Sequence, residues 1–221
     1  MKLGTFLVIL LVSSVGLCQF GYETIGNTVG IPAINNNVCK LADSCFTLTP
    51  DELNQSGAVW DSKPINLSYS FEAEFCLMLG AGDQWGADGI AFVMRGLTSA
   101  NFGEIGGGLG YRGITPSLAI EFDTYPNQDI NVDDIADDHT GLYFNSEYTN
   151  PAVSATPLIP SAANVDDGTF HTARIVWDAV NDTLKMYFDE VLRISHKYDL
   201  VNDLFGGDNQ VLWGFTASTG G

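Results

Sequence analysis

Acidic side chains gather between residues 117 and 141, and this segment holds the residues best suited to chemistry. Glu121 and Asp123 stand two positions apart in an apolar run, and Asp134 and His139 follow them. Because alternate residues of a β-strand share a face, we expect the first two carboxylates to lie side by side. Adjacent carboxylates repel each other unless a proton or a cation lies between them. Oxygen ligands suit Ca²⁺, and carboxylates with one imidazole suit a transition metal such as Mn²⁺.

Three interpretations of this acidic segment compete. The simplest is a solvated loop that binds nothing. The second is an EF-hand-type calcium loop beginning at Asp129, but that motif needs Gly where Asp134 stands and Glu where Thr140 stands. The third is the carboxylate pair of a jelly-roll glycoside hydrolase, which needs two carboxyl groups about 5 Å apart. Pro126 replaces the third acid of the Glu-x-Asp-x-x-Glu pattern in those enzymes, so the proton donor is missing.

The strands that must position these side chains are predicted from alternating hydrophobicity. Apolar and polar residues alternate between Tyr69 and Leu79, as expected for a half-buried strand. The same pattern recurs over residues 90–94, 118–124, 171–177, 184–188 and 211–216. Asn181-Asp182 separates two of these runs, as a hairpin turn would. Helical periodicity is limited to a short turn over residues 198–205, so the pattern predicts an all-β sandwich.

The composition narrows the choice of partners. The chain of 221 residues has 27 acidic and 9 basic side chains, for a net charge of −18. Because such an acidic surface repels phosphate backbones and anionic lipids, we expect neither nucleic-acid binding nor membrane insertion. His171 and His196 lie far from the acidic segment in the sequence. We expect both to be satisfied or exposed side chains rather than metal ligands.

The N-terminus predicts secretion. A lysine is followed by an apolar run from Leu3 to Val15, which is too short for a membrane span and is typical of a signal peptide. We expect residues 1–18 to be removed, leaving a single domain over residues 19–221 that is secreted or held at the cell surface. The remaining cysteines are Cys39, Cys45 and Cys76. Their odd number leaves one without a partner, and the first two could close a small loop, but the pairing stays open.

Four segments occur in a characteristic order along the chain. They are Ala-Asp-Gly at residues 87–89, a glycine loop at residues 106–110, Glu-Phe-Asp-Thr-Tyr-Pro-Asn at residues 121–127 followed by Asp134 and His139-Thr140-Gly141, and Trp-Gly-Phe-Thr-Ala-Ser-Thr-Gly at residues 213–220. Together they resemble the legume-type (L-type) lectins of the concanavalin A-like family. The resemblance covers about residues 55–221 and is closest to secreted bacterial members. It implies a jelly-roll β-sandwich of two antiparallel sheets, with a further segment after Gly221.

The resemblance implies two metal sites. The residues that match the family's transition-metal ligands are Glu121, Asp123, Asp134 and His139. Those that match its calcium ligands are Asp123, Tyr125 through its carbonyl, Asn127 and Asp134. Two aspartates then bridge Ca²⁺ and Mn²⁺ or another transition metal. The register is open by one position, because Asp133 could replace Asp134 in the local sequence Val-Asp-Asp-Ile.

The resemblance also implies a sugar site beside the metals. Asp88 matches the sugar-binding carboxylate, which in the family follows a cis peptide, here Ala87-Asp88. Asn127 would add an amide donor, and backbone N–H groups would complete the contacts, from Gly107 or Gly108 and from the loop of Thr219 and Gly220. Such groups suit the hydroxyls of a sugar, which both donate and accept hydrogen bonds. Tyr111, Tyr125 and Trp85 are candidates for an aromatic ring against the sugar.

The expected function is that of a secreted, calcium-dependent lectin that binds glycans or glycoconjugates. Two alternatives remain: a glycoside hydrolase on the same jelly roll, and a metal-stabilised structural or adhesive surface domain without sugar binding. We expect no enzyme activity, because the third acid is missing. The oligomeric state stays open, a homo-oligomer included, as does the sugar that is bound.

Overall fold

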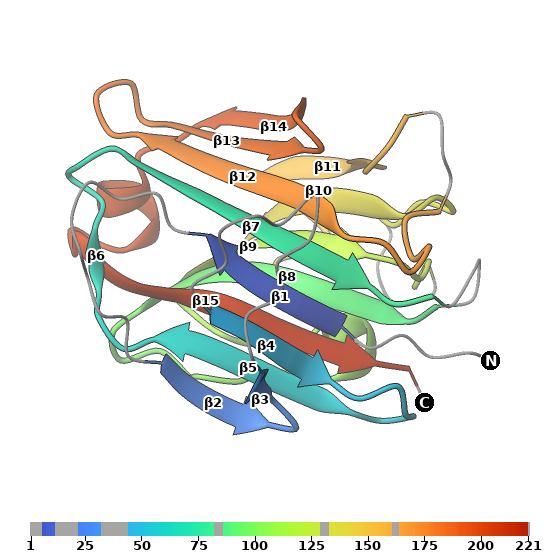
Figure 1. Ribbon diagram of the computed structural model, residues 1–221. Helices are drawn as coiled ribbons and strands as arrows, with labels where there is room; N and C mark the ends of the chain where they lie inside the picture. Colours follow the sequence, from blue (N-terminus) through green and yellow to red (C-terminus); the bar gives the residue numbers. More distant parts are fainter. Residues whose placement is uncertain are drawn as a thin grey trace.

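Strands account for most of the regular structure in the computed structural model, which describes residues 6–11, 22–31, 44–81, 86–128, 133–160 and 164–220. All strand pairs are antiparallel, and they form two sheets (Figure 1). The seven-stranded sheet has the order β14 (Val191–Lys197), β13 (Thr183–Phe188), β12 (His171–Asp178), β7 (Phe71–Leu79), β1 (Phe6–Leu11), β4 (Ser44–Thr49) and β3 (Val29–Ile31).

The eight-stranded sheet carries the acidic segment. Its order is β11 (Val153–Pro157), β10 (His139–Phe144), β9 (Ser117–Asp123), β8 (Asp88–Gly96), β15 (Gln210–Thr219), β5 (Ser56–Asp61) and β2 (Tyr22–Gly26), with β6 (Ile65–Asn66) paired to β15. The strands predicted from alternation are confirmed as β7, β8, β9, β12, β13 and β15. Two antiparallel sheets with few helices confirm the predicted sandwich.

The main core lies between the two sheets. Phe92 of β8 and Phe122 of β9 point from the eight-stranded sheet toward Phe75 of β7. The rings of Phe75 and Phe92 are stacked with centroids 6.0 Å apart, and Phe215 meets Phe75 edge-on at 4.7 Å. Truncating a fully buried phenylalanine to alanine costs about 3–5 kcal/mol, so this aromatic centre contributes much of the fold's stability.

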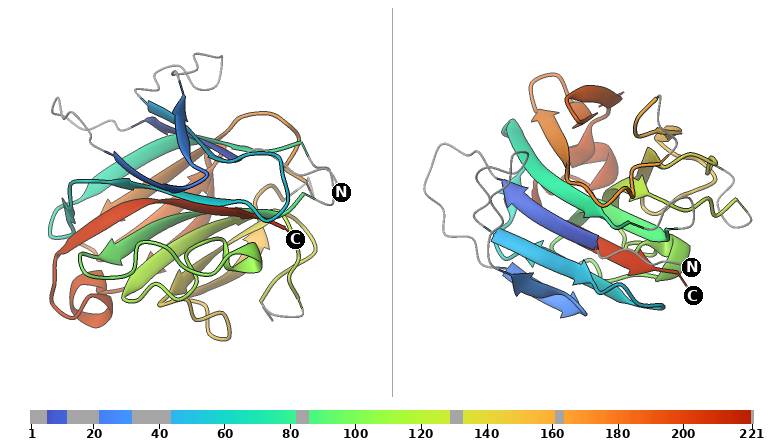
Figure 2. Two further views of the ribbon diagram at one scale, coloured as in Figure 1. Left: turned by 90° about the horizontal axis from the view of Figure 1, so that it is seen from below. Right: turned by 45° about the vertical axis from the view of Figure 1, so that its right-hand side comes forward.

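A second, smaller core covers the outer face of the eight-stranded sheet. Ala91, Ala119 and Tyr143 alternate with the residues of the main core and pack instead under Leu109 and Tyr111. Those two residues belong to the segment between β8 and β9, which contains the short 3-10 helix η2 (Gly106–Gly108). The left view of Figure 2 shows this segment, in light green, crossing the sheet. Glu121 and Asp123 share the outer face, so the segment buries them.

The predicted turns are present. β12 and β13 form a hairpin, and Asp182 in its turn has a positive φ of 50°. The short helical turn is η3 (Leu200–Leu204), a π-helix whose preceding residue Asp199 accepts a hydrogen bond from the Asn202 N–H at 2.9 Å. Within the described residues, no helix has the length and apolarity needed to cross a membrane.

Strand β1 falls within the predicted signal peptide. It lies between β4 and β7 and pairs with both, as Figure 1 shows in dark blue. Cleavage after residue 18 would remove this pairing, and cleavage itself stays a prediction. Among the cysteines, Cys76 of β7 is disulfide-bonded. Cys45 of β4 is a buried free thiol whose pKa burial raises to about 11, so the small loop between Cys39 and Cys45 does not form.

Candidate functional site

Four neighbouring strands bring the predicted site residues to one end of the eight-stranded sheet. Asp88 begins β8, Asp123 ends β9, His139 begins β10 and Thr219 ends β15. The antiparallel register places Asp123 opposite both His139 and Gly89, and Thr219 opposite Asp88. Residues as far apart in the sequence as Asp88 and Thr219 lie together because each stands at the start or the end of its strand.

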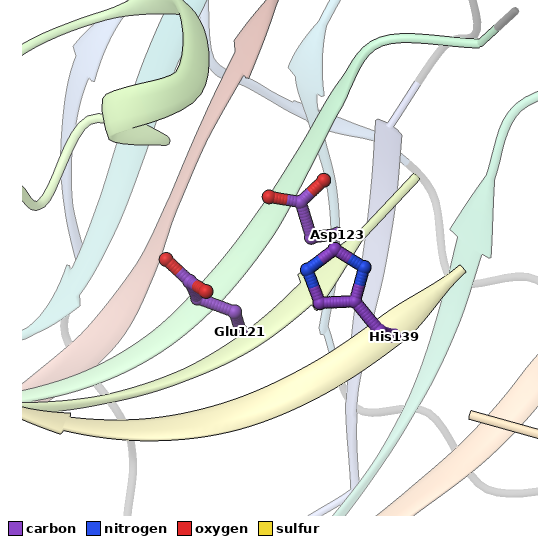
Figure 3. Close-up of side chains that lie close together, drawn as sticks. All are labelled: Glu121, Asp123 and His139. Carbon is purple, nitrogen blue, oxygen red and sulfur yellow. The ribbon is translucent and has the colours of Figure 1, made fainter. Parts of the chain in front are cut away.

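The acidic residues and the histidine form a buried group, here called the site cluster: Glu121, Asp123, Asp134 and His139. One ligand atom from each of Glu121, Asp123 and His139 lies within 4.8 Å of the others. Figure 3 shows these three side chains turned toward one another from β9 and β10. Their exposed fractions are 1%, 2% and 0%. The solvated-loop interpretation is therefore wrong for these residues.

The imidazole of His139 is oriented for coordination. Its Nδ1 lies 3.0 Å from the Asp137 carbonyl oxygen, an arrangement in which Nδ1–H donates. The other nitrogen, Nε2, is buried without a hydrogen-bond partner among the described residues and lies 3.4 Å from Asp134 Oδ1. Metal-binding histidines are held in this way, one nitrogen fixed by a carbonyl and the other turned to the ion.

The carboxylates of the site cluster are electrostatically frustrated. Burial, followed by the charge of Asp123, raises the pKa of Glu121 to about 8. Burial and the charge of Asp134 hold the pKa of Asp123 well above its usual range. Within the described residues, Glu121 Oε2 is buried without a hydrogen-bond partner. A cation among these oxygens and His139 Nε2 would remove the repulsion and satisfy the buried atoms, so the residues fit a metal.

Of the two neighbouring aspartates, Asp134 lies near His139, with Asp134 Oδ1 3.4 Å from His139 Nε2. Asp134 turns to the site cluster, and its Oδ2 accepts the Asn127 N–H at 2.6 Å. Asp133 turns to β11 and accepts the Ala155 N–H, also at 2.6 Å. The side-chain carboxylate of Asp123 accepts the Tyr125 N–H at 2.8 Å, which brings the main chain of Tyr125 to the same place. Residues 129–132, where the EF-hand-type loop would begin, lie outside the described residues.

Asp88, Asn127 and Gly107 meet beside the site cluster. The Ala87-Asp88 peptide is cis, as predicted. Burial raises the pKa of Asp88 to about 6, against a hydrogen bond from the Asn127 side chain that lowers it. Asp88 Oδ2 and Asn127 Oδ1 are both buried and have no hydrogen-bond partner among the described residues. A Cβ on Gly107 would lie 2.6 Å from Asn127 Oδ1, so a larger residue here would require the Asn127 amide to shift.

The backbone donors are partly engaged already. The Thr219 N–H donates to the Gln55 carbonyl at 2.9 Å, and its hydroxyl donates to the Glu52 carbonyl at 2.7 Å. The Gly108 N–H donates to the Ile105 carbonyl at 3.3 Å. The Gly220 carbonyl accepts the Asn54 N–H at 2.9 Å. The N–H group of Thr219 is thus used within the protein, which leaves that of Gly220 as the donor this loop offers.

The aromatic candidates fall into different places. Tyr111 is fully buried and its hydroxyl donates to Glu121 Oε1 at 2.6 Å, so its ring cannot stack on a ligand, contrary to the sequence-based expectation. Tyr125 is half-buried, and Trp85 lies outside the described residues. Asp138 also belongs to the acidic segment of the sequence, but its carboxylate accepts the Val165 N–H at 2.6 Å, and burial raises its pKa to about 6. The contacts of Tyr111 with Glu121 and of Asp138 with Val165 join separate segments of the chain, so no local sequence pattern predicts them.

The arrangement resembles known proteins in sequence and in fold. A family model described as the legume lectin beta-barrel domain matches residues 23–221. Basic winged bean lectin, solved with Tn-antigen, is 21% identical with a TM-score of 0.66, covering 100% of this chain and 89% of that chain. A lectin from Bauhinia forficata in complex with GalNAc is 23% identical with a TM-score of 0.67, covering 90% and 86%. Lectin I-B4 from Griffonia simplicifolia, in a metal-free form, is 24% identical with a TM-score of 0.63, covering 90% and 86%.

Proposed function

Because the chain belongs to the legume lectin beta-barrel domain family, we propose that it binds glycans through a loop site organised by Ca²⁺ and a transition metal. The family match identifies a carbohydrate-binding lectin and not an enzyme, which agrees with Pro126 at the place of the third acid. Secretion, through removal of residues 1–18, is part of this proposal.

One observation supports the proposal most directly. The carboxylate of Asp88 and the amide of Asn127 lie together at the end of the sheet, each with a buried oxygen that has no hydrogen-bond partner among the described residues. Both oxygens are acceptors, so each suits donation from a sugar hydroxyl, and the Asn127 side chain also holds Asp88 in place by a hydrogen bond. The alternative of a purely structural metal loop gives no role to a buried carboxylate at Asp88.

The metals would act on this site through the main chain. Asp134 holds the Asn127 N–H, and Asp123 holds the Tyr125 N–H, so the residues that fit the ions also fix the loop from residue 124 to residue 127. When bound, the ions supply positive charge that neutralises the buried carboxylates. Glu121, Asp123, Asp134 and His139 would hold the transition metal. Asp123, Asp134, Asn127 and the Tyr125 carbonyl would hold Ca²⁺.

The ligand class is the least constrained part. Two of the similar structures contain GalNAc or Tn-antigen, and those ligands are the first to try here. A shallow polar site binds a single sugar weakly, so several linked sites would raise the avidity. A homo-oligomer would supply them.

A glycan array tests the proposal. The protein would be screened with Ca²⁺ and Mn²⁺ present, again after chelation, and beside the variant Asp88→Asn. Losing charge-assisted hydrogen bonds of about 1.5–3 kcal/mol lowers affinity about 10- to 100-fold, so we expect binding to disappear after chelation and in the variant. If wild type binds no glycan while chelation still lowers its melting temperature, the structural alternative is correct. Release of reducing sugar from polysaccharides would instead revive the hydrolase.

A further inference from the structure

Tyr111 connects the metal ligands to the glycine loop. Its side chain is fully buried, and its hydroxyl donates a hydrogen bond of 2.6 Å to Glu121 Oε1. The other carboxylate oxygen, Oε2, is buried without a hydrogen-bond partner among the described residues, and one oxygen of Glu121 lies within 4.8 Å of ligand atoms of Asp123 and His139. With one oxygen fixed by a short hydrogen bond, the carboxylate presents the other in a defined direction.

The same residue anchors the loop that carries Gly107. The Tyr111 N–H donates to the Gly108 carbonyl at 3.0 Å. The loop is closed on itself by the Gly103 N–H, which donates to the Gly110 carbonyl at 2.7 Å. Its other end is held by the Gly106 N–H, which donates to Ser218 Oγ of β15 at 2.7 Å. The loop is therefore a braced unit, and one of its supports is the bond from Tyr111 to Glu121.

The glycine loop lies very close to the Asn127 side chain. Gly107 approaches Asn127 so closely that a Cβ would meet the amide at 2.6 Å. A small shift of the loop therefore changes the space between Gly107 and Asn127. A turn of Glu121 would reach the loop through Tyr111, whose hydroxyl is bonded to Glu121 and whose N–H is bonded to the Gly108 carbonyl.

We propose that Tyr111 is a positioning residue that orients Glu121 for the transition metal and transmits metal binding to the glycine loop. This inference rests on the proposed metal and sugar sites and assigns them a second connection, separate from the calcium ligands. A group that hydrogen-bonds a metal ligand in this way typically contributes 10- to 100-fold to metal affinity. Coupling between two sites is reciprocal, so the factor by which metal tightens sugar binding is also the factor by which sugar tightens metal binding.

The variant Tyr111→Phe removes only the hydroxyl. We expect its Mn²⁺ dissociation constant, measured by titration calorimetry at saturating Ca²⁺, to rise about 10- to 100-fold. With Co²⁺ in place of Mn²⁺, the visible spectrum of the variant should differ from that of wild type, which would not happen if Tyr111 had a purely structural role. GalNAc affinity should fall at limiting Mn²⁺ and return at saturating Mn²⁺.

A matched control is Tyr187→Phe, a tyrosine of β13 whose ring lies under Arg174 with its centroid 4.0 Å from the guanidinium carbon. It tests the loss of a hydroxyl from the other sheet and should leave Mn²⁺ affinity unchanged. Equal Mn²⁺ affinity and an equal Co²⁺ spectrum in Tyr111→Phe and wild type would overturn the inference. If wild type itself bound no Mn²⁺, the proposed function would fail first, and the two failures are thereby distinguished.

Discussion

The molecule has two groups in which a histidine lies between aspartates, and they behave in opposite ways. In the site cluster, His139 is fully buried with three carboxylates. In the second group, here called the rim cluster and made of Asp167, His171 and Asp189, His171 Nδ1 lies 2.7 Å from Asp189 and Nε2 lies 3.5 Å from Asp167. Residue types are the same, so composition does not distinguish a metal site from an ion pair.

Burial makes the difference, because carboxylates of both clusters accept hydrogen bonds. Glu121 and Asp123 are 1% and 2% exposed, whereas the side chains of Asp167 and Asp189 are 46% and 38% exposed. In the rim cluster, Asp189 accepts the Thr172 N–H and Asp167 accepts the Thr169 N–H, each at 2.8 Å. Despite partial burial, these bonds and the charge of His171 lower the pKa of both aspartates, and the aspartates raise the pKa of His171. The site cluster shows raised carboxylate pKa values instead. The rim cluster neutralises itself, whereas the site cluster holds more buried carboxylates than its single histidine can neutralise.

Metal removal should produce the largest contrast between the two clusters. A ligand present at about 100 times its dissociation constant adds about 2.7 kcal/mol of stability, which for a domain of this size is about 5–10 °C in melting temperature. We expect this gain when Ca²⁺ and Mn²⁺ are added to chelated protein and followed by scanning calorimetry. The variant His171→Ala should keep the gain, and His139→Ala should lose most of it. Equal gains in the two variants would break the comparison.

Removing one charge from each cluster should change stability with opposite signs. In metal-free protein at pH 8, Asp123→Asn relieves repulsion among buried carboxylates and should raise the free energy of unfolding by about 1 kcal/mol, the equivalent of one pKa unit. Asp189→Asn weakens the pairing with His171, and because Asp189 is partly exposed the loss should be only about 1 kcal/mol. Urea unfolding measures both. Changes of opposite sign in the free energy of unfolding would support the difference between the two clusters, and a loss of stability in both variants would contradict it.

The pH dependence should separate the clusters further. Glu121 has a folded pKa of about 8, above its unfolded value of about 4.3. Folded metal-free protein thus holds a proton on Glu121 that the unfolded chain releases, so the contribution of Glu121 to stability is full below about pH 4 and is lost as pH rises toward 8. Metal must displace that proton, so the stability gained from metal should be larger at pH 8 than at pH 5.5. A gain that is independent of pH would contradict this assignment.

The rim cluster has a different window. The raised pKa of His171 contributes stability that is present below its unfolded pKa of about 6.5 and is lost as pH rises through the folded value. The lowered pKa values of Asp167 and Asp189 contribute stability that is present above about pH 4 and is lost as pH falls. This cluster therefore stabilises the fold most between about pH 4 and 6.5. His171→Ala should remove that maximum and leave the metal response intact.

Sequence patterns were sufficient for the parts of the molecule that depend on local order. Runs of apolar residues located β7, β8 and β9, although β8 and β9 are buried on both faces and do not have the one-sided burial that alternation predicts. The two-residue period of a strand also placed Glu121 and Asp123 on the same face, which the outer face of β9 confirms. The ligand set came from a family resemblance, and the meeting of Glu121, Asp123 and His139 agrees with it.

Long-range contacts were beyond the sequence. The choice of Asp134 over Asp133 depends on which carboxylate faces Asn127 and which faces β11. The burial of Tyr111 against Glu121 depends on how a long loop folds over the sheet. Use of the Thr219 N–H by Gln55 depends on a strand that is distant in the chain. Each is set by tertiary packing, for which a single sequence has no local periodic signal.

The number of metal ions bound per chain shows most directly whether the site cluster and the residues beside it hold Ca²⁺ and Mn²⁺. Protein dialysed against Ca²⁺ and Mn²⁺, with excess ions then removed, would be analysed by mass spectrometry for bound metal, beside Asp123→Asn and Asp189→Asn. We expect one Ca²⁺ and one Mn²⁺ per wild-type chain, the same for Asp189→Asn, and a loss of both for Asp123→Asn. Wild-type protein that retains no more metal than Asp123→Asn would contradict it.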